Sequence, residues 1–255
     1  MHFRVLGGSG GEIPGQHLSS YLLDDALLID AGSTTAVLGP RAQQKIKNIL
    51  ITHAHLDHVM SLATLSDNLF GIADTIHVWG LPEVIDGLRT SFFNDTLWPD
   101  FTRITADIQS APILSLHEIA EETAVTIGGF EVTAVRVNHA VTSTAFFIEN
   151  RKAGLLHVGD TGPTEKVWAL ARTKKNLRAV VLEASFPNRL QEVADLSQHL
   201  TPLTLAGEAA KLGRPSVPIF VTHLKPQYRE EIIGELKKLK GLRLKILKEG
   251  QTLAL

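Results

Sequence analysis

The stretch His53-Ala54-His55-Leu56-Asp57-His58 decides how this sequence is interpreted. It holds three imidazoles and one carboxylate, all of which can bind a metal ion, and it directly follows Ile46–Ile51, an apolar run typical of a β-strand. The candidate ligand atoms are imidazole nitrogens and a carboxylate oxygen, with no thiolate. Such a set suits Zn²⁺ and can also bind Mn²⁺ or Fe²⁺. In a short loop, the first two histidines can point one way, and the aspartate and last histidine another. The motif therefore indicates two neighbouring metal ions.

Three further candidate ligands each follow an apolar run later in the chain. His139 follows 132–137, Asp160 follows 155–159, and His223 follows 219–222. Strands that end in a ligand place those ligands along one edge of a sheet, where a carboxylate such as Asp160 can bridge two cations. Two ions about 3.5–4 Å apart can share a hydroxide and stabilise both the attacking and the leaving oxygen of a displacement. The sequence therefore predicts a metal-dependent hydrolase.

The order of these residues resembles the ligand pattern of the metallo-β-lactamase superfamily. The resemblance covers nearly the whole chain, including the opening turn Gly7–Gly11 and the strand end Leu28–Gly32. It implies two sets of ligands that share a bridging carboxylate: His53, His55 and His139 for one ion, Asp57, His58 and His223 for the other, and Asp160 between them.

The order of the expected elements predicts the α/β fold of this superfamily, an αββα sandwich of two mixed β-sheets flanked by helices. No linker or low-complexity segment divides the chain, so we expect a single domain over residues 1–255. Strands are expected at 3–6, 20–23, 27–30, 47–52, 75–79, 112–116, 124–127, 130–137, 143–149, 155–158, 178–183, 217–221 and 242–247. Helices are expected at 57–69, 82–90, 164–173, 202–212 and 227–239.

The composition is that of an ordinary globular protein, with 44% hydrophobic and 20% charged residues. A formal net charge of −2 gives no general electrostatic reason to bind nucleic acid or an anionic membrane. No apolar run is long enough to span a bilayer, and the N-terminus lacks the apolar core of a signal peptide. We therefore expect a cytoplasmic protein with no membrane or nucleic-acid partner.

Two later segments, 182–186 and 197–202, resemble the phosphodiesterase branch of the superfamily, which includes the ribonuclease that matures transfer-RNA 3′ ends. In that branch, a glutamate after a late strand supports a histidine that faces the scissile phosphate, and Glu183 and His199 match these positions. The pair suits the chemistry, because the leaving alkoxide takes up a proton while the phosphate oxygens attract a cation. The alternative is that His199 caps the following helix and Glu183 is a surface charge.

The segment Phe92–Phe101, together with His53–Leu62 and Gly80–Leu88, is similar to class II 3′,5′-cyclic-nucleotide phosphodiesterases. The Phe-Asn and Trp-Pro pairs and His199–Pro202 are the more diagnostic parts, since the metal motif occurs across the superfamily. The chain lacks the proline that usually follows the ligand helix in this class. The resemblance implies hydrolysis of cyclic AMP or cyclic GMP to the 5′-monophosphate by a bridging hydroxide, with Asp57, His199 and Glu183 as catalytic residues.

Two other functions remain open at this stage. One is the transfer-RNA 3′-end ribonuclease or a related phosphodiesterase, although the long Gly/Pro- and Lys-rich arm of that ribonuclease is not evident here. The other is a non-catalytic metal- or nucleotide-binding module, against which the complete set of ligands argues. The predicted partner is a small cyclic nucleotide.

A homodimer is also predicted, from the composition of Phe92–Phe101. Three phenylalanines and a tryptophan within ten residues are too apolar for a free loop, and an apolar surface of this kind usually marks an interface. The alternatives are a wall of the substrate site or a hydrophobic mini-core.

Several other polar residues receive structural or supporting roles. Asp30 is expected to hold the ligand loop by hydrogen bonds, and His17 is a candidate for substrate contact because it lies in the Gly-rich loop. The remaining histidines in or beside strands are expected to be structural groups with satisfied hydrogen bonds: His2, His77, His117 and His157.

Overall fold

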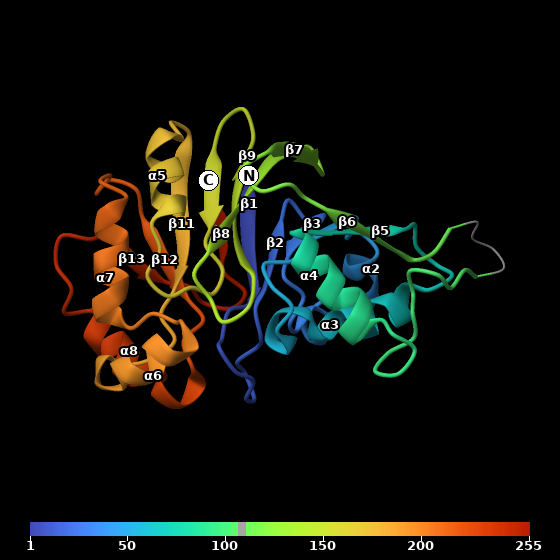
Figure 1. The fold of residues 1–255 in the computed structure, drawn as a ribbon, viewed down its shortest axis with the longest axis horizontal. Coiled ribbons are helices and arrows are strands. Elements are labelled where there is room, and N and C mark those ends of the chain that lie inside the picture. Colours follow the sequence, from blue (N-terminus) through green and yellow to red (C-terminus); the bar gives the residue numbers. More distant parts are fainter. Residues whose placement is uncertain (107–110) are drawn as a thin grey trace.

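The computed structural model describes residues 1–106 and 111–255. Within these ranges the chain folds into two mixed β-sheets with helices on their outer faces (Figure 1). The strand order is β14-β1-β2-β3-β4-β5-β6 in one sheet and β13-β12-β11-β10-β9-β8-β7 in the other. This is the predicted αββα sandwich. No helix within the described ranges is long and apolar enough to cross a membrane.

The first sheet comes from the N-terminal part of the chain, except for one edge strand from the C-terminus. Its strands are β1 (His2–Gly7), β2 (Ser20–Leu23), β3 (Leu27–Ile29), β4 (Asn48–Leu50), β5 (Ile76–Gly80), β6 (Leu114–Glu118) and β14 (Thr252–Ala254). The strands from β3 to β6 are parallel, whereas β14, β1, β2 and β3 pair antiparallel. The accompanying helices are α1 (Thr34–Val37), α2 (Pro40–Gln43), α3 (Leu56–Leu69), α4 (Pro82–Gly87) and the π-helical turn η1 (Leu88–Phe92).

The second sheet comes from the C-terminal part of the chain. Its strands are β7 (Ala124–Ile127), β8 (Phe130–Val137), β9 (Ser143–Glu149), β10 (Gly154–His157), β11 (Leu177–Glu183), β12 (Ile219–Thr222) and β13 (Leu244–Ile246). The strands from β10 to β13 are parallel, and the other pairs are antiparallel. The helical segments are α5 (Lys166–Thr173), η2 (Asn188–Leu190), α6 (Gln191–Ser197), α7 (Pro202–Lys211), η3 (Pro226–Tyr228) and α8 (Arg229–Leu236).

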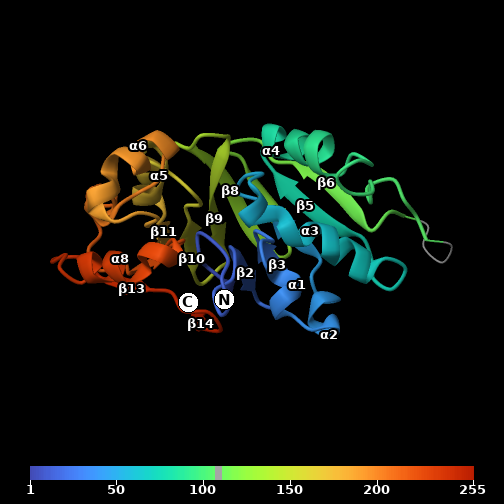
Figure 2. The ribbon, with the colours of Figure 1, turned by 90° about the horizontal axis from the view of Figure 1, so that it is seen from below.

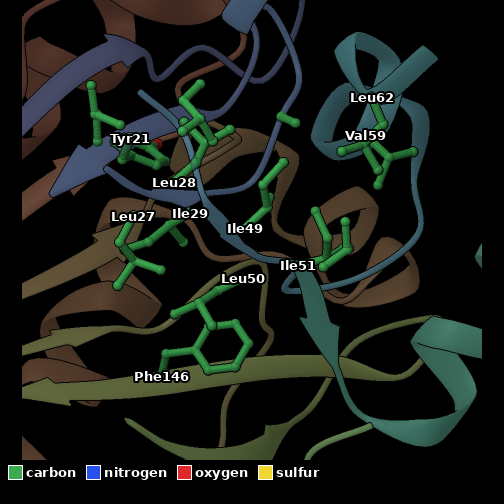
Figure 3. Close-up of a cluster of buried hydrophobic side chains, with 14 of the residues drawn as sticks. Tyr21, Leu27, Leu28, Ile29, Ile49, Leu50, Ile51, Val59, Leu62 and Phe146 are labelled. Atoms are coloured by element: carbon green, nitrogen blue, oxygen red, sulfur yellow. The ribbon is translucent and has the colours of Figure 1, made fainter. Parts of the chain in front are cut away.

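Both faces of β9, an inner strand of the second sheet, are buried, and its successive side chains join two different cores. Along β9, Phe146 and Ile148 join the core between the sheets, whereas Ala145 and Phe147 join the core beneath the outer helices. Successive side chains of a strand point to opposite faces, which produces this division. Figure 3 shows Phe146 near Leu50 of β4, where the two sheets meet. The large buried core on both sides holds the strand ends rigidly in place.

Three α-helices and one strand of the described residues escaped prediction. The helices α1 and α2 have four residues each, which is too short for a helical period to show in the sequence. In α6, Val193 and Leu196 are 43% and 86% exposed, so the helix presents no apolar stripe to the core. The edge strand β14 has only three residues and pairs with β1. Each lacks the pattern on which sequence reasoning depends.

The prediction of an apolar surface at Phe92–Phe101 was wrong in its main part. Phe92, Phe93 and Phe101 belong to the buried core and are 7%, 1% and 5% exposed. Trp98 packs partly buried against the same core, and Leu97 is the large exposed apolar residue of the segment, at 57%. The phenylalanines therefore form the internal mini-core that was the alternative. The homodimer stays a prediction.

Truncation of Phe93 should accordingly act on folding. Phe93→Ala is expected to lower the free energy of unfolding by about 3–5 kcal/mol, because it removes a fully buried ring and leaves a cavity. Urea denaturation measures the change. Leu97→Ala in the same segment is the matched control and should change stability by less than about 0.5 kcal/mol, since its side chain is exposed. Equal losses in the two variants would contradict the internal packing of this segment.

Candidate metal centre and phosphate site

Strand ends from both sheets supply the polar side chains of the centre. His53 and His55 lie in the loop after β4 of the first sheet, and Asp57 and His58 lie in the first turn of α3. From the second sheet, three more residues come shortly after β8, β10 and β12, and one is the last residue of β11: His139, Asp160, His223 and Glu183. The centre therefore lies where the ends of the two sheets meet.

Asp30 fixes the loop that carries the histidine motif, as expected. Its backbone has a φ of 55°, a left-handed conformation that is uncommon for a residue other than glycine. The carboxylate is fully buried and accepts hydrogen bonds from the Thr52 backbone nitrogen at 2.8 Å and from Nδ1 of His58 at 2.7 Å. The strained backbone thus holds a carboxylate beneath the loop.

The first group of candidate ligands contains three imidazoles. Nδ1 of His55 lies 3.0 Å from Nε2 of His53 and 3.3 Å from Nε2 of His139. A single Nδ1 carries either one proton or one lone pair, so it cannot satisfy both neighbours as a hydrogen-bond partner. A cation between the three nitrogens satisfies all of them.

The second group contains Asp57, His58, Asp160 and His223, whose ligand atoms lie within 4.8 Å of one another. Nε2 of His223 is 3.3 Å from Oδ2 of Asp57 and 3.4 Å from Nε2 of His58. With Zn–N bonds of about 2.0–2.1 Å, the ligands of a tetrahedral ion are roughly 3.3–3.4 Å apart. The donor spacing therefore fits a metal ion.

Asp160 connects the two groups. Its Oδ2 atom lies 3.8 Å from Nε2 of His53 in the first group, and 3.4 and 3.3 Å from Nε2 of His58 and His223 in the second. Burial raises the pKa of this carboxyl, but the surrounding imidazoles, His223 foremost, outweigh burial and hold the pKa well below its usual range. Asp160 is thus an ionised carboxylate between both groups, as expected for a bridging ligand.

Oxygen atoms behind the rings orient four of the histidines. In each, Nε2 faces the centre while Nδ1 has an oxygen partner at 2.7–3.0 Å. Metal-binding histidines almost always have such a partner on the second nitrogen, which fixes the ring and its tautomer. The pairs are His53 with Thr52, His58 with Asp30, His139 with the Gln198 carbonyl, and His223 with Ser185.

Glu183 and His199 form a buried pair beside this centre. Oε1 of Glu183 lies 2.6 Å from Nδ1 of His199, and Oδ2 of Asp160 is 4.0 Å from the same nitrogen. Burial lowers the pKa of His199, but the Glu183 carboxylate more than offsets burial and raises it to about 9. None of the described residues hydrogen-bonds Nε2 of His199. The pair thus supplies an oriented imidazole whose second nitrogen is free.

The alternative roles for this pair are wrong. Thr201 caps α7 through a hydrogen bond from the Thr204 backbone nitrogen, and Pro202 occupies the first turn. Glu183 is 1% exposed, so it is not a surface charge. His199 precedes the cap and is 8% exposed, which places it at the centre and not in the helix.

Sequence reasoning missed the role of Ser185. Its hydroxyl donates to Oε2 of Glu183 at 2.5 Å and lies 3.0 Å from Nδ1 of His223 and 3.2 Å from Nδ1 of His199. It therefore joins a candidate metal ligand to the Glu183–His199 pair. A serine next to a strand end carries no sequence signal of its own, and only the fold brings these three partners together.

Ser185→Ala is expected to weaken metal binding about 10–100-fold, because Nδ1 of His223 loses the partner that orients the ring. Metal titration followed by calorimetry checks this. Ser197→Ala, whose hydroxyl bonds only backbone carbonyls of α6, is the matched control and should leave metal affinity unchanged. Wild-type metal affinity in Ser185→Ala would show that the serine does not position His223.

The Gly-rich loop packs directly against His223. A Cβ at Gly10 would lie 2.7 Å from the His223 carbonyl oxygen and 2.9 Å from its Nδ1, so only glycine fits there. The backbone nitrogen of His223 donates to the Gly8 carbonyl at 2.7 Å, and His223 has a φ of 61°. The loop therefore helps to hold this candidate ligand in an uncommon backbone conformation.

The histidines outside the centre are of two kinds: two differ from expectation, and three do not. His17 pairs with Glu249, whose Oε2 lies 2.7 Å from Nδ1. His157 is buried against Tyr21 with neither ring nitrogen hydrogen-bonded, which corrects its expected satisfied state, and burial lowers its pKa to about 4. His2 has Asp24 as its partner, and His77 and His117 pair with each other, as expected of structural groups.

The fold and this cluster of histidines and carboxylates define a hydrolase-type metal site on a metallo-β-lactamase scaffold. The unliganded yeast PDE1 structure superposes on the chain with a TM-score of 0.85 at 21% identity, covering 100% of this chain and 99% of that one. The family model of class-II cAMP phosphodiesterases matches residues 40–254. The chain therefore belongs to the class-II cAMP phosphodiesterase family, a family of metallohydrolases.

Curated relatives extend the comparison. A probable 3′,5′-cyclic-nucleotide phosphodiesterase of Yersinia pestis is 28% identical, covering 97% of this chain and 87% of the relative. Ribonuclease Z of Borreliella afzelii is 26% identical, covering 91% of this chain and 89% of the relative. The chain is thus similar along most of its length to both kinds of phosphodiesterase.

Proposed function

We propose that the protein hydrolyses 3′,5′-cyclic nucleotides to 5′-monophosphates with the help of two divalent cations, for which zinc best matches the donor set. Family membership supports the reaction class. The observation that carries the proposal is the buried Glu183–His199 pair beside Asp160, because it places a proton donor next to the two groups of metal ligands.

The two cations would occupy the two groups that Asp160 joins. His53, His55 and His139 would hold one ion, and Asp57, His58 and His223 the other. Bound there, the cations would supply Lewis acidity, lowering the pKa of water and neutralising the charge of the phosphate. Neutral imidazoles are needed for this, and burial lowers the pKa of His53 well below its usual value. At His58 the effect of burial is outweighed by the carboxylates of Asp160 and Asp30, which raise its pKa.

His199 acts on the departing oxygen in this proposal. When water adds to phosphorus, it releases one proton to solvent, the bond from phosphorus to the 3′ oxygen breaks, and the 3′ oxygen takes a proton from Nε2 of His199. Glu183 keeps the ring oriented and charged through Nδ1. The protonated imidazole also attracts the phosphate oxygens before the bond breaks. Solvent then returns a proton to Nε2.

Glu183→Gln should retain both metals and lose part of the activity. The amide still bonds Nδ1 but no longer stabilises the imidazolium charge, so kcat for cyclic AMP is expected to fall about 10–100-fold. The ratio of kcat values for cyclic AMP and bis-p-nitrophenyl phosphate measures the selectivity of the loss. Glu192→Gln on the exposed face of nearby α6 is the control. An equal loss on both substrates would contradict a role through proton donation.

A substrate panel tests the proposed reaction against its closest rival. Metal-loaded protein should convert 3′,5′-cyclic AMP or cyclic GMP to the 5′-monophosphate, and should act poorly on 2′,3′-cyclic nucleotides and on precursor transfer RNA. The extended similarity to ribonuclease Z makes precursor transfer RNA the necessary comparison. Cleavage of that RNA without turnover of cyclic nucleotides would replace the proposed function with the ribonuclease.

A further inference from the structure

A cavity of about 230 Å³ lies behind the segment that carries His223. The N-terminal Gly-rich loop, the end of β12, the start of α8 and the chain after β13 surround it. Figure 2 shows the blue N-terminal loop beside α8. None of the seven candidate metal ligands lines this cavity. It is therefore separate from the metal centre, although it shares a wall with it.

An unpaired cation lines the cavity. Nη1 of Arg229 is buried and has no hydrogen-bond partner, whereas the residue as a whole is half-buried, and Arg229 forms no ion pair with any described residue. Buried groups of this kind are nearly always satisfied by a protein group, a water or a ligand. The guanidinium is a planar donor that matches phosphate and carboxylate oxygens. Arg229 therefore points to an oxyanion as its missing partner.

The other charges around the cavity favour an anion as well. Lys248 is a second lining cation with no side-chain partner among the described residues. Glu249 is the carboxylate that lines it, and this group is already bonded to His17 through the backbone nitrogen at 2.6 Å and Nδ1 at 2.7 Å. The lining thus has two cations and one carboxylate that is already engaged.

The remaining walls are part apolar and part polar, with polar side chains from Ser9, Gln16 and Thr222, and the space is small. Val5, Val221, Leu224, Ile246 and Leu247 contribute apolar side chains. The volume is below the roughly 300–1,000 Å³ of pockets that bind drug-sized ligands. A ligand that fits is therefore smaller than a nucleotide and has a short apolar body.

We propose that this cavity is a second binding site, for a compact ligand that joins a phosphate or carboxylate head to a short apolar body. The head would pair with Arg229 and the body would contact the apolar wall. Occupancy would also reach the metal centre. Thr222 lines the cavity, immediately precedes His223, and donates its hydroxyl to the same Gly8 carbonyl that accepts from the His223 backbone nitrogen.

Thermal unfolding of the metal-loaded full chain tests the binding. Butyl phosphate and hexanoate are the two oxyanion probes, hexanol is the neutral control, and 5′-AMP is the control for size. The Tm is expected to rise with the concentration of one or both small anions, because a ligand that binds only the folded state stabilises it. Which anion gives the larger rise identifies the head group. A rise with hexanol equal to that with hexanoate would overturn the proposal.

Arg229→Met locates the site. It should abolish the anion-dependent rise in Tm, and its own unliganded Tm should equal or exceed that of the wild type, because the variant removes a buried unpaired donor. Arg229→Lys should retain part of the rise. Arg41→Met, an exposed arginine of α2, is the matched control and should behave like the wild type.

Two further results would overturn the proposal. A rise in Tm that survives in Arg229→Met would place the anion elsewhere, including at the metal centre. An unliganded Arg229→Met protein that unfolds several degrees earlier would assign the guanidinium to folding. For the link to His223, hexanoate or butyl phosphate should change the affinity for Zn²⁺ in the wild type and not in Arg229→Met. These readouts are independent of the substrate, so they can fail while the proposed function stands.

Discussion

Asp160→Ala is expected to lose both divalent cations and nearly all activity. Its Oδ2 atom is 3.3–3.8 Å from the ligand nitrogens of both groups, so removing it opens both sites and leaves their imidazoles without the shared negative charge. Metal ions contribute several kcal/mol of transition-state stabilisation. Because about 1.4 kcal/mol corresponds to a tenfold change in rate, kcat should fall by at least about 10³-fold. Metal analysis of the purified variant and a cyclic AMP assay measure the two losses.

The control is Asp67→Ala, which removes an exposed carboxylate from the same helix that carries Asp57 and His58. It should retain both cations and wild-type activity. His139→Ala should fall between the two, since it removes one ligand of one ion. Two cations per chain in Asp160→Ala would show that Asp160 is not the bridge.

His199→Ala is expected to keep both metals and lose about 10²–10⁴-fold in kcat for cyclic AMP, the usual effect of losing a general acid. The structure supports this because Nδ1 of His199 bonds Glu183 at 2.6 Å while Nε2 is left for substrate. The loss should be much smaller with bis-p-nitrophenyl phosphate, whose leaving group needs no proton. Comparing kcat for the two substrates isolates proton donation from phosphate binding.

His2→Ala controls for the loss of an imidazole. His2 is exposed and pairs with Asp24, and neither residue belongs to the candidate metal centre. It should leave both rates unchanged. If kcat of His199→Ala falls by the same factor on both substrates, His199 binds phosphate and does not donate the proton. If it also loses a metal ion, His199 is itself a ligand, as its distances to His139 and Asp160 allow.

The candidate ligands could be predicted because each carries its own local signal. An apolar run followed by histidine or aspartate indicates a strand end, and the carboxyl ends of strands that run in the same direction meet at one edge of a sheet. His53, His139 and Asp160 come together for this reason, although β4 and the strands β8 and β10 belong to different sheets. The resemblance to the metallo-β-lactamase superfamily added which of these ligands would share an ion.

The supporting residues could not be predicted, because their roles depend on contacts between distant segments. Ser185 is a common residue that becomes important only where β11 brings it beside His223. Arg229 is one of many cations until its Nη1 is seen buried without a partner. Phe93 shows the opposite error, since its apolar neighbourhood suggested an interface and the fold buries it. Composition reports that a side chain is apolar and not which surface covers it.

The central claim is that metal ions held by the two joined groups enable hydrolysis of a cyclic nucleotide. The most direct measurement follows the conversion of 3′,5′-cyclic AMP to 5′-AMP by purified protein before chelation, after complete chelation, and after Zn²⁺ is restored, with the metal content determined in each sample. We predict turnover at about two ions per chain, loss of turnover with the metal, and recovery on addition of Zn²⁺. Turnover at the original rate in a fully metal-free sample would contradict the account.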